Sequence, residues 1–159
     1  MSKLVFIASD HAAFDLKKQI KKYLTGLGYQ VKDFGAYSYN PEDDYPDFIF
    51  PAAQAMAKHK GSRGIMLGGS GLGECIVANK IKGVRAVRAW DIMSAKMSRA
   101  HNDANVLCLG AGKTKDKAAH GMILTLTQAK SILNIWLKTP FSGKLRHIRR
   151  LKKISQYEA

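Results

Sequence analysis

A strand, a glycine-rich loop and a helix follow one another in the middle of the sequence, and this succession constrains the fold most. Residues 64–67 predict the end of a buried strand, residues 68–73 hold four glycines, and residues 74–80 predict a helix. Glycines let a backbone approach its ligand closely, and the free amides at a helix N-terminus favour negative charge. The succession therefore predicts an anion-binding loop with Glu74 beside the ligand.

Two common nucleotide loops do not fit this stretch. It lacks the Gly-Lys-Ser/Thr ending of nucleotide hydrolases. Its glycine spacing differs from the dinucleotide-binding fingerprint, and it follows the third predicted strand rather than the first. The plainer alternative is a tight strand-to-helix turn in which Glu74 is a favourable first-turn charge.

Composition predicts one globular domain. The chain has 159 residues, of which 46% are hydrophobic and 24% charged, so we expect a single domain over residues 1–159. No apolar run approaches the roughly 18 residues of a membrane span, and the first residues show no signal-peptide pattern. Cys75 and Cys108 form neither a disulfide framework nor a metal-ligand spacing. We expect a cytoplasmic protein without membrane contact, metal or cofactor.

The formal net charge of +14 has three possible explanations. A basic surface is typical of nucleic-acid binding, but it also attracts small anionic substrates, and some proteomes are simply basic. The sequence contains no arginine-rich arm, no zinc spacing and no aromatic-and-basic RNA motif. We therefore favour a small anion over nucleic acid as the partner.

Strands and helices alternate along the chain. Predicted strands cover residues 4–8, 30–34, 61–67, 83–89 and 104–109, and predicted helices cover 12–27, 47–58, 74–80, 91–99, 114–137 and 143–157. This rhythm predicts an α/β fold with a doubly wound, parallel five-stranded sheet and flanking helices.

Polar residues directly follow the first strand. Ligands of open parallel sheets bind at the carboxyl ends of the strands, which favours a chemical role for Asp10 and His11. The alternative is that Asp10 or Ser9 only caps the next helix, and the two roles are compatible. Tyr45 lies in a long polar loop, and loops of such length are often functional.

Further candidates lie in the second half of the chain. His101 and Asn102 occupy a polar turn just before the fifth strand. Arg146 and Arg150 lie four residues apart and so share one face of the last helix. Taken alone, these arginines favour a solvated basic face.

Seven segments, in this order, resemble the type B ribose-5-phosphate isomerases and the related galactose-6-phosphate isomerase subunits. They are Ser9-Asp10-His11-Ala12, Asp44-Tyr45-Pro46-Asp47, Gly68-Gly69-Ser70-Gly71-Leu72-Gly73-Glu74, Ala78-Asn79-Lys80, Gly83-Val84-Arg85-Ala86, Ser98-Arg99-Ala100-His101-Asn102 and Arg146-His147-Ile148-Arg149-Arg150. The resemblance implies a flavodoxin-like sheet and metal-free aldose–ketose isomerisation of a sugar phosphate. It also implies a homodimer or homotetramer with sites at subunit interfaces, where the C-terminal helix, about 143–157, packs on a partner.

The resemblance also implies the catalytic residues. Many members carry a cysteine base where this chain has Gly68, whereas one branch carries a glutamate just after the glycine loop, as Glu74 does here. His101 matches the acid that opens the sugar ring, with help from Asp10, and Ser70 matches a residue that orients the hydroxyl proton. Cys75 points in a different helical direction from Glu74, and we expect it to be packed.

The substrate contacts implied by the resemblance form a larger set. Amides of the glycine loop and Asn102 would hold the enediolate oxygens, the basic residues would bind phosphate, and Tyr45 would line the sugar pocket. The implied set is Asp10, His11, Tyr45, Gly69, Ser70, Gly71, Leu72, Gly73, Asn102, Lys113, Arg146 and Arg150.

Two departures from the family pattern leave the sugar open. The family commonly has an arginine after the fifth strand, where this chain has Gly112 followed by Lys113. The region 113–137 is roughly ten residues longer than in relatives, about the length of a short helix. Ribose 5-phosphate is the first expectation, and a six-carbon phosphate such as allose or galactose 6-phosphate is the alternative. A non-catalytic relative that binds anions or nucleic acid is the alternative from another class.

Overall fold

Five parallel strands form one sheet in the order β2–β1–β3–β5–β4. The computed structural model describes residues 3–112 and 123–158. The strands are β1 Leu4–Ser9, β2 Gln30–Asp33, β3 Arg63–Gly68, β4 Ala86–Arg88 and β5 Val106–Gly110. The predicted α/β class and the parallel five-stranded sheet are confirmed.

The last two strands exchange places relative to the flavodoxin order 2-1-3-4-5. All five residues of β5 are buried, and the strand lies inside the sheet between β3 and β4. β4 has only three residues and forms the edge. Its predicted start at Gly83 is too early, because the Arg85 amide donates to the Asn105 side chain (2.7 Å) instead of to a strand. Burial on both faces therefore places the apolar strand in the interior.

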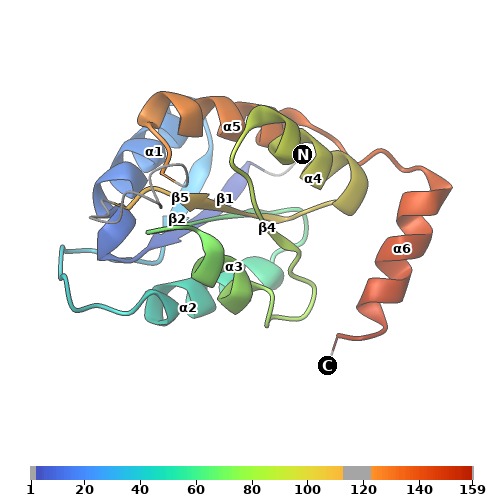
Figure 1. Cartoon of the computed structure of the whole chain (residues 1–159), viewed down its shortest axis with the longest axis horizontal. Helices are drawn as coiled ribbons and strands as arrows, with labels where there is room; N and C mark the ends of the chain where they lie inside the picture. Colours follow the sequence, from blue (N-terminus) through green and yellow to red (C-terminus); the bar gives the residue numbers. More distant parts are fainter. Residues whose placement is uncertain (1–2, 113–122, 159) are drawn as a thin grey trace.

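Helices cover both faces of the sheet. They are η1 His11–Ala13, α1 Phe14–Gly26, α2 Tyr45–Ala57, α3 Leu72–Ala78, α4 Ile92–Asn102, α5 Leu126–Lys138 and α6 Leu145–Ser155. Figure 1 shows α1, α4 and α5 over one face and α2 and α3 over the other. Because side chains alternate along a strand, Val5 and Ile7 pack under the first layer, and Phe6 and Ala8 under the second.

Several predicted helix boundaries differ from the structure. The first helix is preceded by the short 3-10 turn η1, capped by Asp10, and α2 begins two residues earlier than expected, at Tyr45. The predicted helix 114–137 is described only in part, as α5, because residues 113–122 lie outside the described residues. No helix of the described ranges has the length and apolarity required to cross a bilayer.

The last helix stands apart from the layers. Figure 1 shows α6 at one end of the molecule, beyond α4. The Ser142 amide donates to the Ala100 carbonyl (3.0 Å), which fixes the connection to the end of α4. His147 is the one buried side chain of this fully described helix, whereas Leu145 is 84% exposed. Most of the apolar stripe of α6 thus lies outside the core of its own chain.

Candidate functional site

The carboxyl ends of the three central strands lie side by side. Together they form the carboxyl edge of the sheet, which runs across the strands. Asp10 and His11 follow β1, the glycine loop follows β3, and Gly112 lies just after β5. The Gly112 amide donates to the Gly69 carbonyl (3.2 Å), so the segment after β5 lies against the loop. A Cβ at Gly112 would press on the Gly69 backbone, which explains why this close approach needs glycine.

Glu74 lies at the centre of this edge. It belongs to the first turn of α3 and is only 3% exposed. A Cβ built on Gly68 would overlap the Glu74 carboxylate, so this carboxylate fills the space where another side chain at position 68 would begin. Glu74 therefore points back into the end of β3 rather than into solvent.

The surroundings of Glu74 favour proton transfer. Burial raises the pKa of the Glu74 carboxyl, and the nearby Asp10 charge raises it further, against hydrogen bonds from the Glu74 and Gly71 amides. Among the described residues, its Oε2 atom is buried without a hydrogen-bond partner. A buried carboxylate with a raised pKa and an uncommitted oxygen is suited to act as a base.

Asp10 and His11 lie beside this carboxylate. Asp10 is 7% exposed, accepts a hydrogen bond from the Ala12 amide (3.1 Å) and caps η1, so capping and proximity to the site occur together. Burial is the main cause that raises the pKa of Asp10. The His11 imidazole pairs through Nδ1 with Asp43 Oδ1 at 2.6 Å, and this hydrogen bond raises the pKa of His11.

Asp43 is a site residue that the sequence analysis missed. It directly precedes the Asp44-Tyr45-Pro46-Asp47 segment, where several neighbouring acids obscure it. Ligand atoms of Asp10, His11 and Asp43 come within 4.8 Å of one another, which makes them the described group that could hold a metal ion. Hydrogen bonds already engage Asp10 Oδ1, His11 Nδ1 and Asp43 Oδ1, so the set is built as a hydrogen-bonded cluster.

Tyr45 and Ser70 frame the same edge. A Cβ on Gly73 would come within 2.7 Å of the Tyr45 ring, so this tyrosine lies directly over the loop. Ser70 Oγ accepts from the Leu72 amide (3.2 Å), and the Ser70 carbonyl accepts from Arg88 Nε (2.6 Å). Leu72 itself is 48% exposed at the start of α3.

A second cluster gathers where α4 ends and α6 begins. The rings of His101 and His147 lie 4.4 Å apart. Arg146 Nε donates to His147 Nε2 (3.1 Å), and Ser142 Oγ lies 2.7 Å from His147 Nδ1. Burial and the neighbouring cations lower the pKa of His147, which agrees with a neutral ring that accepts from the arginine. Arg150 is exposed one turn further along α6.

Arginines hold the turn that carries His101 and Asn102. Arg85 Nε donates to the Asn102 carbonyl (3.0 Å), and Arg85 Nη2 pairs with the Asp103 carboxylate (3.0 Å). The buried Arg99 pairs with the same carboxylate (2.7 Å), while Asp103 has the left-handed φ of 45°. The sequence analysis placed Arg85 and Arg99 in family segments but assigned them no role.

The two clusters lie at opposite ends of the strands. α4 starts after the carboxyl end of β4 and runs back to the amino end of β5, so His101 and Asn102 are at the far edge from Glu74. Five strand residues span roughly 17 Å. The structure thus brings together Asp10, His11, Tyr45, Glu74 and the loop 69–73, and separately His101, Asn102, Arg146 and Arg150. Lys113 lies outside the described residues.

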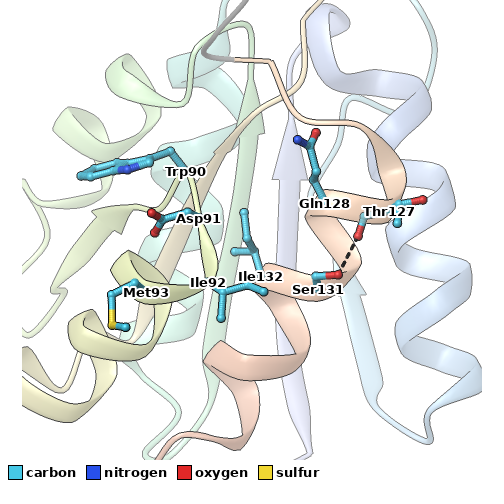
Figure 2. A pocket seen from close by; sticks show the side chains of 8 residues that line it. All are labelled: Trp90, Asp91, Ile92, Met93, Thr127, Gln128, Ser131 and Ile132. Carbon is cyan, nitrogen blue, oxygen red and sulfur yellow. Dashed lines mark hydrogen bonds between the residues drawn. The ribbon is translucent and has the colours of Figure 1, made fainter.

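Exposed apolar side chains also follow the carboxyl end of β4. Trp90, Ile92 and Met93 line a pocket of about 430 Å³ with Ile132 and three polar residues of α5 (Figure 2). Asp91 and Gln128 are occupied locally, since Asp91 caps α4 and the Gln128 side chain accepts from the Thr125 amide in the capping box of α5. Leu72 and Ile76 of α3 are exposed as well. Exposed apolar side chains therefore lie on α3, the helix of Glu74, and at the start of α4.

The similarity to known proteins extends over nearly the whole chain. The ribose/galactose isomerase family model matches residues 5–154. Ribose-5-phosphate isomerase B of Mycolicibacterium paratuberculosis is 40% identical over 154 residues, which cover 97% of this chain and 91% of that protein.

Solved structures agree with this match. Ribose-5-phosphate isomerase B of Clostridium thermocellum superposes with a TM-score of 0.86 at 40% identity, covering 98% of this chain and 97% of that one. The Mycoplasma genitalium enzyme, solved with bound ribulose 5-phosphate, gives 0.87 at 38% identity, covering 98% and 95%. The chain belongs to the ribose/galactose isomerase family.

Proposed function

We propose that this chain interconverts ribose 5-phosphate and ribulose 5-phosphate through an enediolate, with Glu74 as the base. Membership of an isomerase family makes the protein a sugar-phosphate isomerase. One observation carries the assignment of the base. The Glu74 carboxylate is buried, has a raised pKa and fills the space beside Gly68, where many relatives would place a cysteine.

The reaction moves one proton between neighbouring carbons. In the open-chain aldose, Glu74 takes the proton from C2, the electron pair of that bond forms the C1–C2 double bond, and the carbonyl pair of C1 moves onto its oxygen to give the enediolate. The protonated Glu74 then returns the proton to C1, which leaves the ketose. Ser70 passes the hydroxyl proton between the two oxygens, and the loop amides stabilise the negative oxygen.

A second copy of the chain supplies the remaining groups in this proposal. His101 would open the ring, Asn102 would hold the enediolate, and Arg146 and Arg150 would bind the phosphate in paired hydrogen bonds. Support comes from the separation of these residues from Glu74 by the length of a strand. Exposed apolar residues lie on a helix of each half-site, Leu72 and Ile76 on α3 and Leu145 on α6. We propose a homodimer, or a homotetramer built from such dimers, in which α6 packs on the partner.

Replacing Glu74 tests the base. Glu74→Gln keeps the size of the side chain but cannot accept a proton, so we expect kcat to fall about a hundredfold to ten-thousandfold while sugar phosphate still binds. The pKa of Glu74 is raised, so the wild-type rate should fall with decreasing pH at a higher pH than for a solvated glutamate. Ribulose 5-phosphate formation, followed across pH, measures both effects.

The neighbouring Cys75 offers a matched control. Cys75→Ala should keep its turnover, because the partly buried thiol packs among apolar side chains of α2 and the sheet. A Cys75→Ala variant as inactive as Glu74→Gln would mean that the thiol is the base. A Glu74→Gln variant with wild-type turnover would end the carboxylate assignment.

A six-carbon substrate is the second candidate. The matching family includes galactose isomerases, and Gly112 stands where relatives carry an arginine. A panel of ribose 5-phosphate, allose 6-phosphate and galactose 6-phosphate decides, and much faster turnover of a hexose would reassign the substrate. The free Cys75 and Cys108 suit a reducing compartment, and we propose the cytoplasm.

A further inference from the structure

We propose that Asp43 is a positioning residue for His11: it holds the His11 amide and the imidazole by one hydrogen bond each and keeps the ring cationic, so that Nε2–H binds the substrate phosphate. This inference rests on the proposed function, because the phosphate is that of the sugar substrate. Nothing in the family segments marks Asp43, and the contact joins residues 32 positions apart.

The geometry shows one carboxylate oxygen serving one residue twice. Asp43 Oδ1 accepts from the His11 backbone amide at 2.9 Å and lies 2.6 Å from His11 Nδ1. The Asp43 side chain is 9% exposed and that of His11 is 30% exposed, so the pair is partly shielded from water. Since Nδ1 is engaged, Nε2 is the ring nitrogen that can meet a ligand.

The His11 side chain lines a cavity near the carboxyl end of β1. This cavity has a volume of about 360 Å³ and is lined by Ala12, Asp15, Leu16 and Tyr39 together with His11 and Ala111. Ala111 directly follows β5 and precedes the two positions where the chain departs from the family pattern. The cavity therefore lies between the end of β1 and the end of β5, beside the glycine loop.

The charges around His11 favour the cation. Asp10, Asp15 and Asp43 are the acids near it, and Tyr39 presents its ring at 6.3 Å. The hydrogen bond to Asp43 raises the pKa of His11 most, burial opposes it, and the Asp10 charge adds to the rise. An imidazolium binds a dianionic phosphate more strongly than a neutral ring does.

Asp43, rather than Asp10, is committed to this task. Asp10 accepts from the Ala12 amide and caps η1, so its carboxylate is already engaged away from the His11 ring. In the described part of the chain, Asp43 Oδ2 is buried with no other partner, so no competing group draws the carboxylate away from His11. The alternative is that Asp43 only anchors its loop.

Removing the charge separates these roles. Asp43→Asn keeps an oxygen that can accept from the His11 amide but loses the negative charge. We expect KM for ribose 5-phosphate to rise about tenfold at about pH 7.5, with kcat nearly unchanged. Lowering the pH towards about 6 should bring the KM of the variant close to that of the wild type at the same pH, because the imidazole then protonates without help. Glu42→Gln, an exposed acid of the same loop, is the matched control and should change neither constant.

Two measurements do not depend on turnover. The first is the NMR titration of the His11 ring, whose signal is assigned because it is missing from the spectrum of His11→Asn. The midpoint of this titration should fall in Asp43→Asn and stay unchanged in Glu42→Gln. The second is calorimetric binding of inorganic phosphate, which should weaken only in Asp43→Asn. If Asp43→Asn does not fold, Asp43→Glu replaces it, and its retained carboxylate should keep the midpoint above that of an ordinary histidine.

The outcomes are distinct. An unchanged His11 midpoint, or a rise in KM that persists relative to wild type at low pH, would overturn the role of Asp43 and leave a loop anchor. A wild-type protein inert towards every sugar phosphate would remove the proposed function, while the NMR and phosphate measurements would still decide about Asp43.

Discussion

Gly68 and Glu74 share one volume at the end of β3. A side chain on Gly68 would start where the Glu74 carboxylate lies. A side chain at position 68 and the Glu74 carboxylate therefore cannot occupy this space together. The position of the Glu74 carboxylate thus accounts for the glycine at position 68.

Filling this volume should disable the site. In Gly68→Ala, we expect the methyl group to push the Glu74 carboxylate out of position, so that kcat falls at least about a hundredfold. Overpacking should cost about 1–3 kcal/mol of stability, and the fold should survive. Kinetics with a denaturation curve check both expectations.

Gly26→Ala is the matched control for this substitution. Gly26 lies at the end of α1 with no atom within 4 Å of an added Cβ, so its kcat should remain at the wild-type level. Wild-type turnover in Gly68→Ala would contradict the shared-volume account.

Helix α1 is tied to β2 by a buried charge. Lys17, on the inner face of α1, is 1% exposed, and its ammonium donates to Asp33 Oδ1 and to the Ala36 carbonyl, both at 2.7 Å. Burial lowers the pKa of Lys17, while Lys17 and Lys21 together hold the pKa of Asp33 below its ordinary value. Asp33 also accepts from the Gly35 amide (3.1 Å), next to the segment that pairs with Ser9.

Breaking this link should cost more than its surface counterpart. Asp33→Ala leaves the Lys17 ammonium buried without its carboxylate, and we expect a loss of about 3 kcal/mol in unfolding free energy. Lys21→Ala removes a half-exposed partner of the same carboxylate and should cost less than about 1 kcal/mol. Urea unfolding of both variants compares them, and equal losses would refute the asymmetry.

Local patterns predicted most elements, since periodicity and turn residues are properties of neighbouring positions. They predicted the strand–loop–helix around Glu74 and the burial of the strand before the loop, but not the burial of Glu74 itself. They could not predict Lys17 inside the core or the pairing of His11 with Asp43, because the partners are 16 and 32 positions away. The exchange of β4 and β5 could not be predicted either, because strand order depends on tertiary packing.

At the scale of the whole molecule, the separated half-sites make a prediction about mixtures. Glu74→Gln and His101→Asn should each be nearly inactive alone. In a mixture, about half of the randomly reassorted dimers are mixed, and each rebuilds one of its two sites, so activity should return to about a quarter of wild type. Mixtures are measured after dissociation and reassembly.

A site confined to one chain would give no recovery in that experiment. Mixing Glu74→Gln with Ser70→Ala provides the control, because both residues belong to the same half-site and no mixed dimer can restore it. Recovery in this control would contradict the division of the site.

The buried carboxylate on α3 and the imidazole at the end of α4 are separated by about the length of one strand. With the roles proposed above, an isolated chain holds the base without the acid that opens the substrate. The turnover per protein molecule would then depend on the protein concentration in the cell. When the protein is scarce enough for its dimers to dissociate, halving its amount lowers the cell's isomerase flux by more than half.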